Sequence, residues 1–228
     1  MKNIALVFAR GGSKGLLNKN IIKLNGKPLI YYAISLAKNS KIIDDIYVST
    51  EDFRISKIAN NYGAKIIKRP KYLATDNSPE IKSWQHAIKY LNKKNIFPSK
   101  IFVLPTTSPL RNQNDLNKAS KMLNSKTDIV ISITETNHNP YFNMVKLNNQ
   151  KYCKLIMKSK KKYYRRQEAP KVYNMTTSIY ATTPKYILNS KNIFDGKVKG
   201  LMIPFERSID IDNKFDFELA KIFFRNIK

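Results

Sequence analysis

The sequence predicts an α/β fold whose strands form a mostly parallel sheet. Short runs rich in β-branched residues alternate with longer stretches of helical periodicity through the first two thirds of the chain, and this alternation is typical of βαβ units. At 228 residues the chain should bury roughly 70% of its unfolded surface and fold without a disulfide or a metal. We therefore expect one α/β domain, with room for a modest extension.

The expected strands before residue 135 are short and rich in Ile and Val; they span residues 4–8, 46–49, 65–68, 100–105 and 128–133. The helical patterns that separate them span residues 28–39, 51–63, 79–93 and 114–125. Pro28 and Pro79 suit the first position of a helix, and Gly63 suits the position after a last turn. These three residues sharpen the expected boundaries.

The alternation stops near residue 135. Residues 140–182 carry many Tyr and Lys residues in short extended runs, which predicts an inserted β arm rather than another βαβ unit. A last strand is expected at 200–204 and a closing helix at 213–227. One apolar face of this helix is expected to pack on the sheet, because four apolar residues recur at helical spacing: Phe215, Leu219, Ile222 and Phe223.

The charge balance is strongly basic, with 42 Lys and Arg against 16 Asp and Glu and a net charge of +26. Binding to nucleic acid is one explanation. Codon bias is the other: Lys far outnumbers Arg, Ile and Asn are abundant, and the lysines are spread along the chain. We favour codon bias and do not expect nucleic acid as a partner, although a positive field would attract a polyphosphate substrate.

The cellular compartment follows from cysteine content and hydropathy. Cys153 is the single cysteine, which excludes an intramolecular disulfide and suits a reducing cytoplasm. The apolar run at residues 4–8 is shorter than a secretory signal requires, and no later stretch approaches the ~20 apolar residues that span a bilayer. We therefore expect a cytoplasmic protein without a membrane partner.

The stretch "ARGGSKGLLNKN" at residues 9–20 directly follows the first strand. Its glycines match neither the GxxxxGK[ST] nor the GxGxxG spacing of the common phosphate-binding loops. Its basic residues Arg10, Lys14 and Lys19 could nevertheless neutralise phosphates. Ligands of α/β sheets bind at the carboxyl ends of strands, where this loop would lie. The stretch therefore predicts a phosphate site.

The stretch "SIDID" places two carboxylates two residues apart. If it is extended, Asp210 and Asp212 share one face and Ile209 and Ile211 the other. Carboxylates ~6–7 Å apart repel each other unless a cation lies between them, and Mg²⁺ suits such a pair. Alternatively, one aspartate caps the closing helix and the other is solvated. A basic loop combined with a metal-binding pair predicts a nucleotidyl or phosphoryl transferase.

Two further stretches leave alternatives open. In "LPTTSPLR" at 104–111, hydroxyls and Arg111 follow the fourth strand, but these residues alone favour a turn that caps the next helix. In "RRQEAPK" at 165–171, two arginines could bind a carboxylate bidentately, or could form a solvated face of the arm. His86 and His138 have no acid and nucleophile arranged as a triad.

Seven stretches together closely resemble the acylneuraminate cytidylyltransferases, also called CMP-sialic acid synthetases: "ARGGSKGLLNKN", "LNGKPLI", "VSTED", "RPKYLATD", "TTSPLR", "RRQEAPKVY" and "ERSIDID". They occur in order over nearly the whole chain. The resemblance implies a single nucleotidyltransferase domain, residues 1–228, with a Rossmann-like sheet. It also implies a homodimer in which the arm, residues 140–182, reaches the partner's site. The implied reaction couples CTP to a nine-carbon 2-keto sugar acid, with Mg²⁺, and releases pyrophosphate.

The resemblance implies roles for individual residues. Asp210 and Asp212 match the family's metal-binding aspartates, and with Arg10 and Lys19 they are the implied catalytic residues. Nucleotide binding is implied for Arg10, Gly11, Gly12, Ser13, Lys14, Lys19, Asn20, Arg69 and Asp76. Binding of the sugar acid is implied for Arg166, which matches the carboxylate-binding arginine, and for Tyr180, Thr106 and Ser108.

Three departures from the family pattern bear on the substrate. Pro105 replaces a glutamine that contacts the sugar, and Pro79 and Glu80 stand where a serine pair is usual. No residue clearly matches the family's sugar-binding lysine, Lys146 being one candidate. A legionaminic- or pseudaminic-type acid therefore fits as well as N-acetylneuraminate. One alternative is a nucleotidyltransferase for another base or sugar acid. A CMP-Kdo type is ranked lower, because those enzymes usually lack the "KN" that ends the loop at residues 9–20. The other alternative is a basic nucleic-acid-binding protein.

Overall fold

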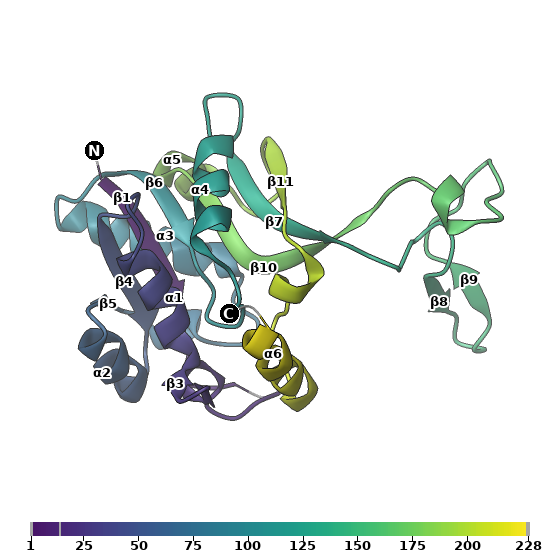
Figure 1. The fold of residues 1–228 in the computed structure, drawn as a ribbon. Helices are drawn as coiled ribbons and strands as arrows, with labels where there is room; N and C mark the ends of the chain where they lie inside the picture. The colour runs from purple at the N-terminus through teal and green to yellow at the C-terminus, as the bar shows by residue number, and fades with distance from the viewer. Residues whose placement is uncertain (1, 14, 227–228) are drawn as a thin grey trace.

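A twisted central sheet organises the molecule (Figure 1). The structure is a computed structural model that describes residues 2–13 and 15–226. The sheet has seven strands in the order β11-β7-β10-β6-β1-β4-β5. All neighbouring strands are parallel except β10, which is antiparallel to β6 and β7. Their bounds are β1 (Lys2–Phe8), β4 (Asp45–Thr50), β5 (Lys65–Lys68), β6 (Pro98–Val103), β7 (Ile129–Glu135), β10 (Tyr173–Thr182) and β11 (Val198–Met202). The predicted mostly parallel α/β sheet is confirmed.

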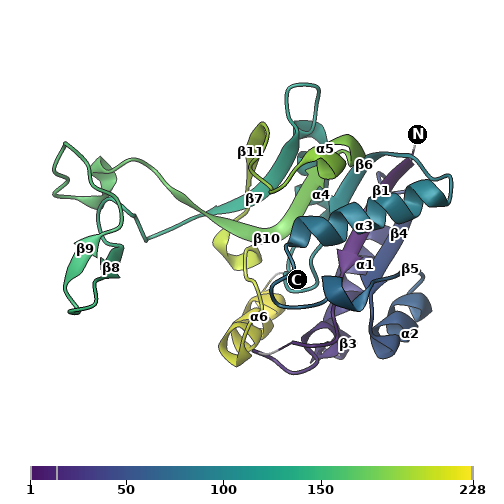
Figure 2. The same ribbon diagram turned by 180° about the vertical axis from the view of Figure 1, so that it is seen from behind.

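Helices cover both faces of this sheet and its lower end. Their bounds are α1 (Leu29–Lys38), α2 (Phe53–Asn61), α3 (Glu80–Lys93), α4 (Gln113–Met122), α5 (Pro184–Asn189) and α6 (Lys214–Asn226). One apolar core lies between the sheet and α1, α2 and α4. A second lies between the opposite face, seen in Figure 2, and α3 and α5. A third joins α6 to the β2–β3 hairpin, and both lie at the same end of the molecule in Figures 1 and 2.

Among the described residues, the smaller elements are two hairpins and four 3-10 helices. The hairpins are β2 (Lys23–Leu24) with β3 (Lys27–Pro28), and β8 (Val145–Leu147) with β9 (Cys153–Leu155). The 3-10 helices are η1 (Lys19–Ile21), η2 (Lys71–Leu73), η3 (Arg166–Glu168) and η4 (Phe205–Arg207). None of these elements is long enough to show a periodic sequence pattern, so sequence reasoning did not find them.

The predicted strands and long helices are present within a few residues of their expected bounds. Pro28 and Pro79 lie one residue earlier than expected, at the N-cap positions of α1 and α3. Gly63 follows α2 with a φ of +93°, a conformation that favours glycine. The fourth strand ends at Val103, so the last residues of the predicted range belong to the loop that follows.

A long arm leaves the body after β7, carries the β8–β9 hairpin and η3, and returns as β10 (Figures 1 and 2). The predicted range of 140–182 is wrong at its end. Most of β10 lies in the centre of the sheet, paired with β6 and β7, and Tyr180 and Thr182 on it are buried. The run "YNMTTSIYAT" alternates like the strands of the arm, so sequence reasoning did not separate the returning strand from the projecting segment.

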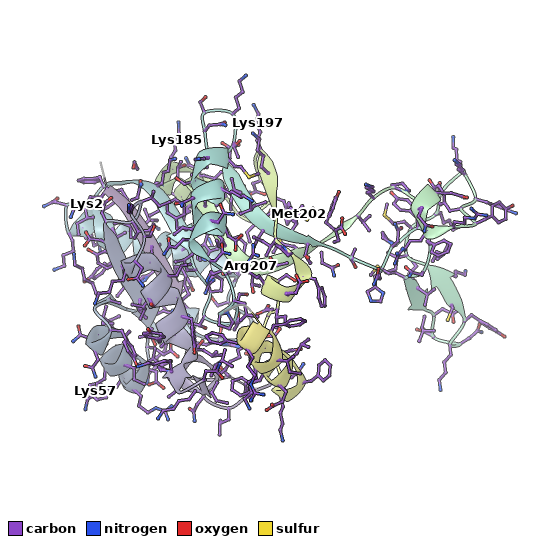
Figure 3. The ribbon with its side chains drawn as sticks, in the orientation of Figure 1. Lys2, Lys57, Lys185, Lys197, Met202 and Arg207 are labelled. Carbon is purple, nitrogen blue, oxygen red and sulfur yellow. The ribbon has the colours of Figure 1, made fainter. Side chains whose placement is uncertain are left out.

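The basic residues are distributed rather than gathered in one stripe. Lys57 lies at one end of the body, and Lys185 and Lys197 lie at the other (Figure 3). This distribution agrees with the dispersed lysines of the sequence. Within the described part of the chain, no helix is both long and apolar enough to cross a membrane.

Candidate active site

Three separate segments line one cavity of about 370 Å³. They are the loop after β1, the loop after β6 and the segment before α6, with Arg69 at the end of β5. The lining residues are Phe8, Arg10, Ser13, Gly15, Lys19, Asn20, Arg69, Pro105, Thr106, Thr107 and Asp212. The cavity therefore brings together seven residues that the sequence predicted for the site: Arg10, Ser13, Lys19, Asn20, Arg69, Thr106 and Asp212.

Asn20 fixes the spacing between the first two of these segments. Its side chain is buried, Nδ2 donates to the carbonyl oxygen of Arg10 at 2.8 Å, and Oδ1 accepts from the hydroxyl of Thr106. Both ends of the amide are thus engaged by protein groups. Asn20 holds the loop after β1 against the loop after β6, and this places the other residues of the loop around the cavity.

The two arginines of the site are held in different ways. Arg10 makes an ion pair with Asp76, with Nη1 and Oδ1 2.6 Å apart. Arg10 lines the cavity, whereas Asp76 does not. Arg69 is only 6% exposed and donates to the carbonyl and hydroxyl oxygens of Ser49 at 2.6 and 3.2 Å. Burial lowers the pKa of Arg69 to about 10, so it remains a cation at neutral pH.

The glycines of the loop allow close packing against neighbouring segments. A Cβ at Gly11 would lie 2.5 Å from Oδ2 of Asp52, and one at Gly15 would lie 2.4 Å from the carbonyl oxygen of Asp212. The N–H of Gly11 donates to Oε1 of Glu51 at 2.7 Å. Neither Gly11 nor Gly12 lines the cavity. Lys14, also predicted for nucleotide binding, lies outside the described residues.

The acidic pair faces the basic loop. Asp212 accepts from Nζ of Lys19 at 2.7 Å. Asp210 lies deeper, and burial raises the pKa of its carboxyl. The charge of Asp212 raises this pKa further. The hydroxyls of Thr107 and Thr177 and the charge of Lys19 lower it, and the net shift is upward. Oδ1 of Asp210 is buried and makes no hydrogen bond with the described residues.

The alternation of "SIDID" holds although the segment forms no strand. Ile209 and Ile211 are buried in the core under α6, which leaves the two aspartates on the other face. The N–H of Ile211 donates to the carbonyl oxygen of Thr107 at 2.9 Å. The start of α6 is satisfied by Asn213 and Asp216, so neither Asp210 nor Asp212 is needed as its cap.

Among the described residues, seven of the predicted ones do not line this cavity: Gly11, Gly12, Asp76, Asp210, Ser108, Tyr180 and Arg166. Ser108 is fully buried and its hydroxyl lies 2.9 Å from that of Thr177. Tyr180 is 1% exposed and its ring packs edge-on against Trp84, with centroids 5.2 Å apart. Arg166 lies on η3 of the arm, where its guanidinium donates to Asn137, and it lines a second cavity of about 710 Å³. Within this chain, Arg166 does not line the first cavity.

Several residues of the site carried no sequence signal of their own. Thr107 belongs to the hydroxyl-rich stretch at residues 104–111, but no feature of the sequence distinguished it from Thr106. Thr177 was hidden in the segment assigned to the arm. Glu80, the first residue of α3, was noted in the sequence only because it stands where the family usually has a serine. Burial raises the pKa of its carboxyl and Asp210 raises it further, while Trp84 and Arg69 oppose the rise.

A basic loop and an acidic segment at the carboxyl edge of a mostly parallel sheet are typical of a nucleotidyl or phosphoryl transferase. Residues 4–223 match the model of a family described as Cytidylyltransferase. The chain belongs to the cytidylyltransferase family, and the resemblance seen in its motifs is confirmed.

Named relatives and a solved structure agree with this assignment. The chain is 36% identical over 230 residues to a pseudaminic acid cytidylyltransferase of Campylobacter jejuni, covering 99% of this chain and 97% of that protein. It is 35% identical over 223 residues to a CMP-N,N'-diacetyllegionaminic acid synthase of the same species, covering 96% and 93%. A solved CMP:2-keto-3-deoxy-manno-octonic acid synthetase complexed with CTP is similar with a TM-score of 0.73, covering 99% of both chains at 15% identity. This last likeness shows the fold alone.

Proposed function

We propose that this chain is a Mg²⁺-dependent cytidylyltransferase that couples CTP to a nine-carbon 2-keto sugar acid of the pseudaminic, legionaminic or N-acylneuraminic type. The family match covers nearly the whole chain, and its relatives are named for acids of this class. Such an enzyme joins the anomeric hydroxyl of the sugar acid to the α-phosphate of CTP and releases pyrophosphate.

The observation that carries the proposal is the ion pair between Lys19 and Asp212 at 2.7 Å. These residues come from opposite ends of the chain, and they bring the basic loop and the acidic segment to one cavity, which Asp212 lines. Cations on one side and carboxylates on the other match the needs of a triphosphate that carries a metal ion. Arg10, Lys19 and Ser13 would hold the phosphates, and Arg69 and Asn20 would lie toward the nucleoside.

The two aspartates fit a magnesium ion. Oδ1 of Asp210 is a buried carboxylate oxygen without a hydrogen-bond partner among the described residues, and the carboxylate of Asp212 lies on the same face of the segment. Mg²⁺ is commonly bound by one or two carboxylates together with substrate phosphates, so Asp210 and Asp212 would hold it. When bound, the ion stabilises negative charge on the α-phosphate and on the leaving pyrophosphate.

The sugar acid is proposed to bind where the arm of a second subunit approaches the cavity. Arg166 would bind its carboxylate bidentately, but within one chain this arginine lies on the arm (Figure 1). The arm also exposes apolar side chains that suit an interface between subunits: Met144, Val145, Leu147, Leu155, Ile156 and Met157. We infer a cytoplasmic homodimer in which each arm completes the partner's site.

The reaction is tested by measuring pyrophosphate release with each of the four nucleoside triphosphates and a panel of 2-keto sugar acids. The panel holds pseudaminic, legionaminic and N-acetylneuraminic acids and Kdo. Turnover is expected with CTP and at least one nine-carbon acid, and it should require Mg²⁺. Absence of CTP-dependent turnover with every acid would rule out the proposal.

A second candidate is a nucleotidyltransferase with another base or sugar acid. It is favoured by Pro105, which lines the cavity where sialic-acid enzymes usually have a glutamine, and by Glu80 at the start of α3. The same panel separates the two candidates, because the second requires turnover with Kdo or with a nucleotide other than CTP.

A further inference from the structure

The loop after β1 is fastened to the chain that follows β4. Among the described residues, backbone pairing between these two strands reaches as far as the bond from the N–H of Ala9 to the carbonyl oxygen of Ser49, at 3.1 Å. Beyond that bond, side chains from the start of α2 hold the loop. Arg10, Ser13 and Lys19 belong to this loop and line the cavity, so the way the loop is held decides where they lie.

Glu51 makes the first of these attachments. The N–H of Gly11 donates to Oε1 of Glu51 at 2.7 Å, and a bond to a charged acceptor is about twice as strong as one between neutral groups. The loop also packs tightly there, because a Cβ at Gly11 would lie 2.5 Å from Oδ2 of Asp52. Gly11 itself does not line the cavity, whereas Arg10 and Ser13 on either side of it do. Glu51 therefore fixes the backbone between two residues of the site.

Arg54 makes the second attachment, at the other end of the loop. Its Nη2 donates to Oδ1 of Asn18 at 3.1 Å and to Oδ2 of Asp52 at 3.0 Å. Asn18 has a φ of +53° and immediately precedes η1, whose residues Lys19 and Asn20 line the cavity. The start of α2 is thus joined to the loop near both of its ends.

The two attachments differ in burial. The side chain of Arg54 is 59% exposed, so water competes with its bonds and its ion pair contributes little. Glu51 lies closer to the interior, since its Oε2 is buried and makes no hydrogen bond with the described residues. The charge of Glu51 also opposes the fall in the pKa of Arg69 that burial causes. Glu51 is therefore the stronger attachment, and its loss should affect the site more.

We propose that Glu51 is a positioning residue that holds the backbone at Gly11 and thereby directs Arg10 and Ser13 at the phosphates of CTP. This inference rests on the proposed function, in which the loop binds the triphosphate. Because Glu51 acts through that loop, its loss should weaken the binding of CTP and spare the binding of cytidine, which has no phosphate. A general folding defect would weaken both.

The test measures CTP binding by isothermal titration calorimetry, without sugar acid so that no turnover occurs, and cytidine binding by competition with CTP. Glu51→Ala should weaken CTP binding about tenfold and leave cytidine binding unchanged. Glu51→Gln keeps an oxygen that can accept from Gly11 and should retain most of the affinity for CTP. Glu51→Asp keeps the charge but shortens the side chain by one methylene, so it should lose affinity as Glu51→Ala does.

Asp44→Ala is the matched control. Oδ2 of Asp44 accepts from the N–H of Asn3 at 2.7 Å, which is a bond of the same kind at the opposite end of β1. Asp44 does not line the cavity, so this variant should bind CTP as the wild type does. A loss equal to that of Glu51→Ala would mean that such bonds act only through the stability of β1, and it would overturn the inference.

The outcomes separate this inference from the function on which it rests. If the wild type binds CTP no more tightly than cytidine, the loop does not bind phosphates and both are wrong. If the wild type prefers CTP and Glu51→Ala keeps that preference, only the role of Glu51 is wrong. An equal loss in Glu51→Gln and Glu51→Ala would assign the effect to charge instead of the hydrogen bond, and would also overturn the inference. If Glu51→Ala does not fold, Glu51→Asp decides, and normal CTP binding by that variant overturns the inference.

Discussion

Asp212 is the residue at which the two halves of the site touch. Its carboxylate accepts from Lys19, and its carbonyl oxygen lies directly against Gly15. The acidic segment and the basic loop are therefore in contact through both side chain and backbone. At this scale the site depends on how closely two loops approach, and a single added methyl group can test this.

Gly15→Ala should weaken catalysis, whereas Gly12→Ala should not. A Cβ at Gly15 would lie 2.4 Å from the backbone oxygen of Asp212, but one at Gly12 meets nothing within 4 Å. Since a backbone oxygen cannot move aside cheaply, the alanine at position 15 must push the loop and the acidic segment apart. We expect a loss of about 100-fold in kcat/KM for CTP, as for a misplacement of about 1 Å. Equal kinetics of the two variants would contradict the close packing.

Asp210→Asn and Asp212→Asn should each lower kcat about 100- to 1,000-fold, the usual effect of removing a group that stabilises transition-state charge. Each change keeps the shape of the side chain and removes its charge, so the thermal midpoint should stay close to that of the wild type. Glu218→Gln is the control, because it removes a surface carboxylate of α6 that pairs with Lys221 and lies outside the cavity. Wild-type rates in both variants would rule out metal binding by Asp210 and Asp212.

At the scale of elements, one buried carboxylate connects α4 to the segment that carries the acidic pair. Asp115 and Asn112 form a capping box at the start of α4. The same carboxylate, 1% exposed, accepts from Nη2 and Nε of Arg207 at 2.7 and 3.1 Å. Arg207 ends η4 and lies shortly before Asp210. The helix start thus fixes the entry of the acidic segment.

Arg207→Met should destabilise the fold by about 3–5 kcal/mol, because it leaves the buried charge of Asp115 without its partner. Lys221→Met removes an exposed pair of α6 and should cost less than about 1 kcal/mol. Urea unfolding at pH 7 measures both. Equal unfolding free energies in the two variants would mean that the buried pair is replaced by other contacts.

Asp45, the first residue of β4, makes the stability of the fold depend on pH. Burial alone would raise the pKa of Asp45, but hydrogen bonds and charge from Lys65 and Lys2 outweigh burial and leave the pKa lowered. A carboxyl with a lowered folded-state pKa stabilises the fold above its unfolded value, and this stability is lost as the pH falls through the folded value. Asp45→Asn should therefore be less stable than the wild type at pH 7, with the difference shrinking below about pH 4. A constant difference in urea midpoint across this range would exclude the linkage.

Elements with strong local signals were predictable, and those fixed by distant contacts were not. Helix α3 shows clear apolar periodicity after Pro79, and Gly63 marks the end of α2 because a φ of +93° favours glycine. Strand β10 was assigned to the arm, since its position between β6 and β7 depends on pairing and not on its own residues. The charged residues that line the cavity were predicted, whereas Thr177 lies at an irregularity in the pairing of β10 with β7 that no sequence pattern encodes.

At the scale of the whole molecule, the arm separates the predicted residues of the site. Arg10, Lys19 and Asp212 line one cavity in the body, whereas Arg166 lies on the arm, beside a different cavity. The arm projects away from the body in both views (Figures 1 and 2). In the two-fold homodimer that we propose, the arm of each subunit reaches the cavity of the other.

Complementation between two inactive variants tests this arrangement. Arg166→Met and Asp212→Asn should each be nearly inactive alone, because each dimer would then contain two defective sites. When the two chains are co-expressed, half of the dimers should be mixed, and each mixed dimer should contain one site with neither change. The mixture should therefore recover about a quarter of the wild-type activity, as expected for random pairing in a two-fold dimer.

Co-expression of Asp210→Asn with Asp212→Asn is the control. Both residues belong to the body of the same chain, so every site keeps a defect and no activity should return. If the first pair also fails to recover activity while the mixed dimers are isolated intact by two affinity tags, each site is built from a single chain, and Arg166 does not reach the partner's cavity.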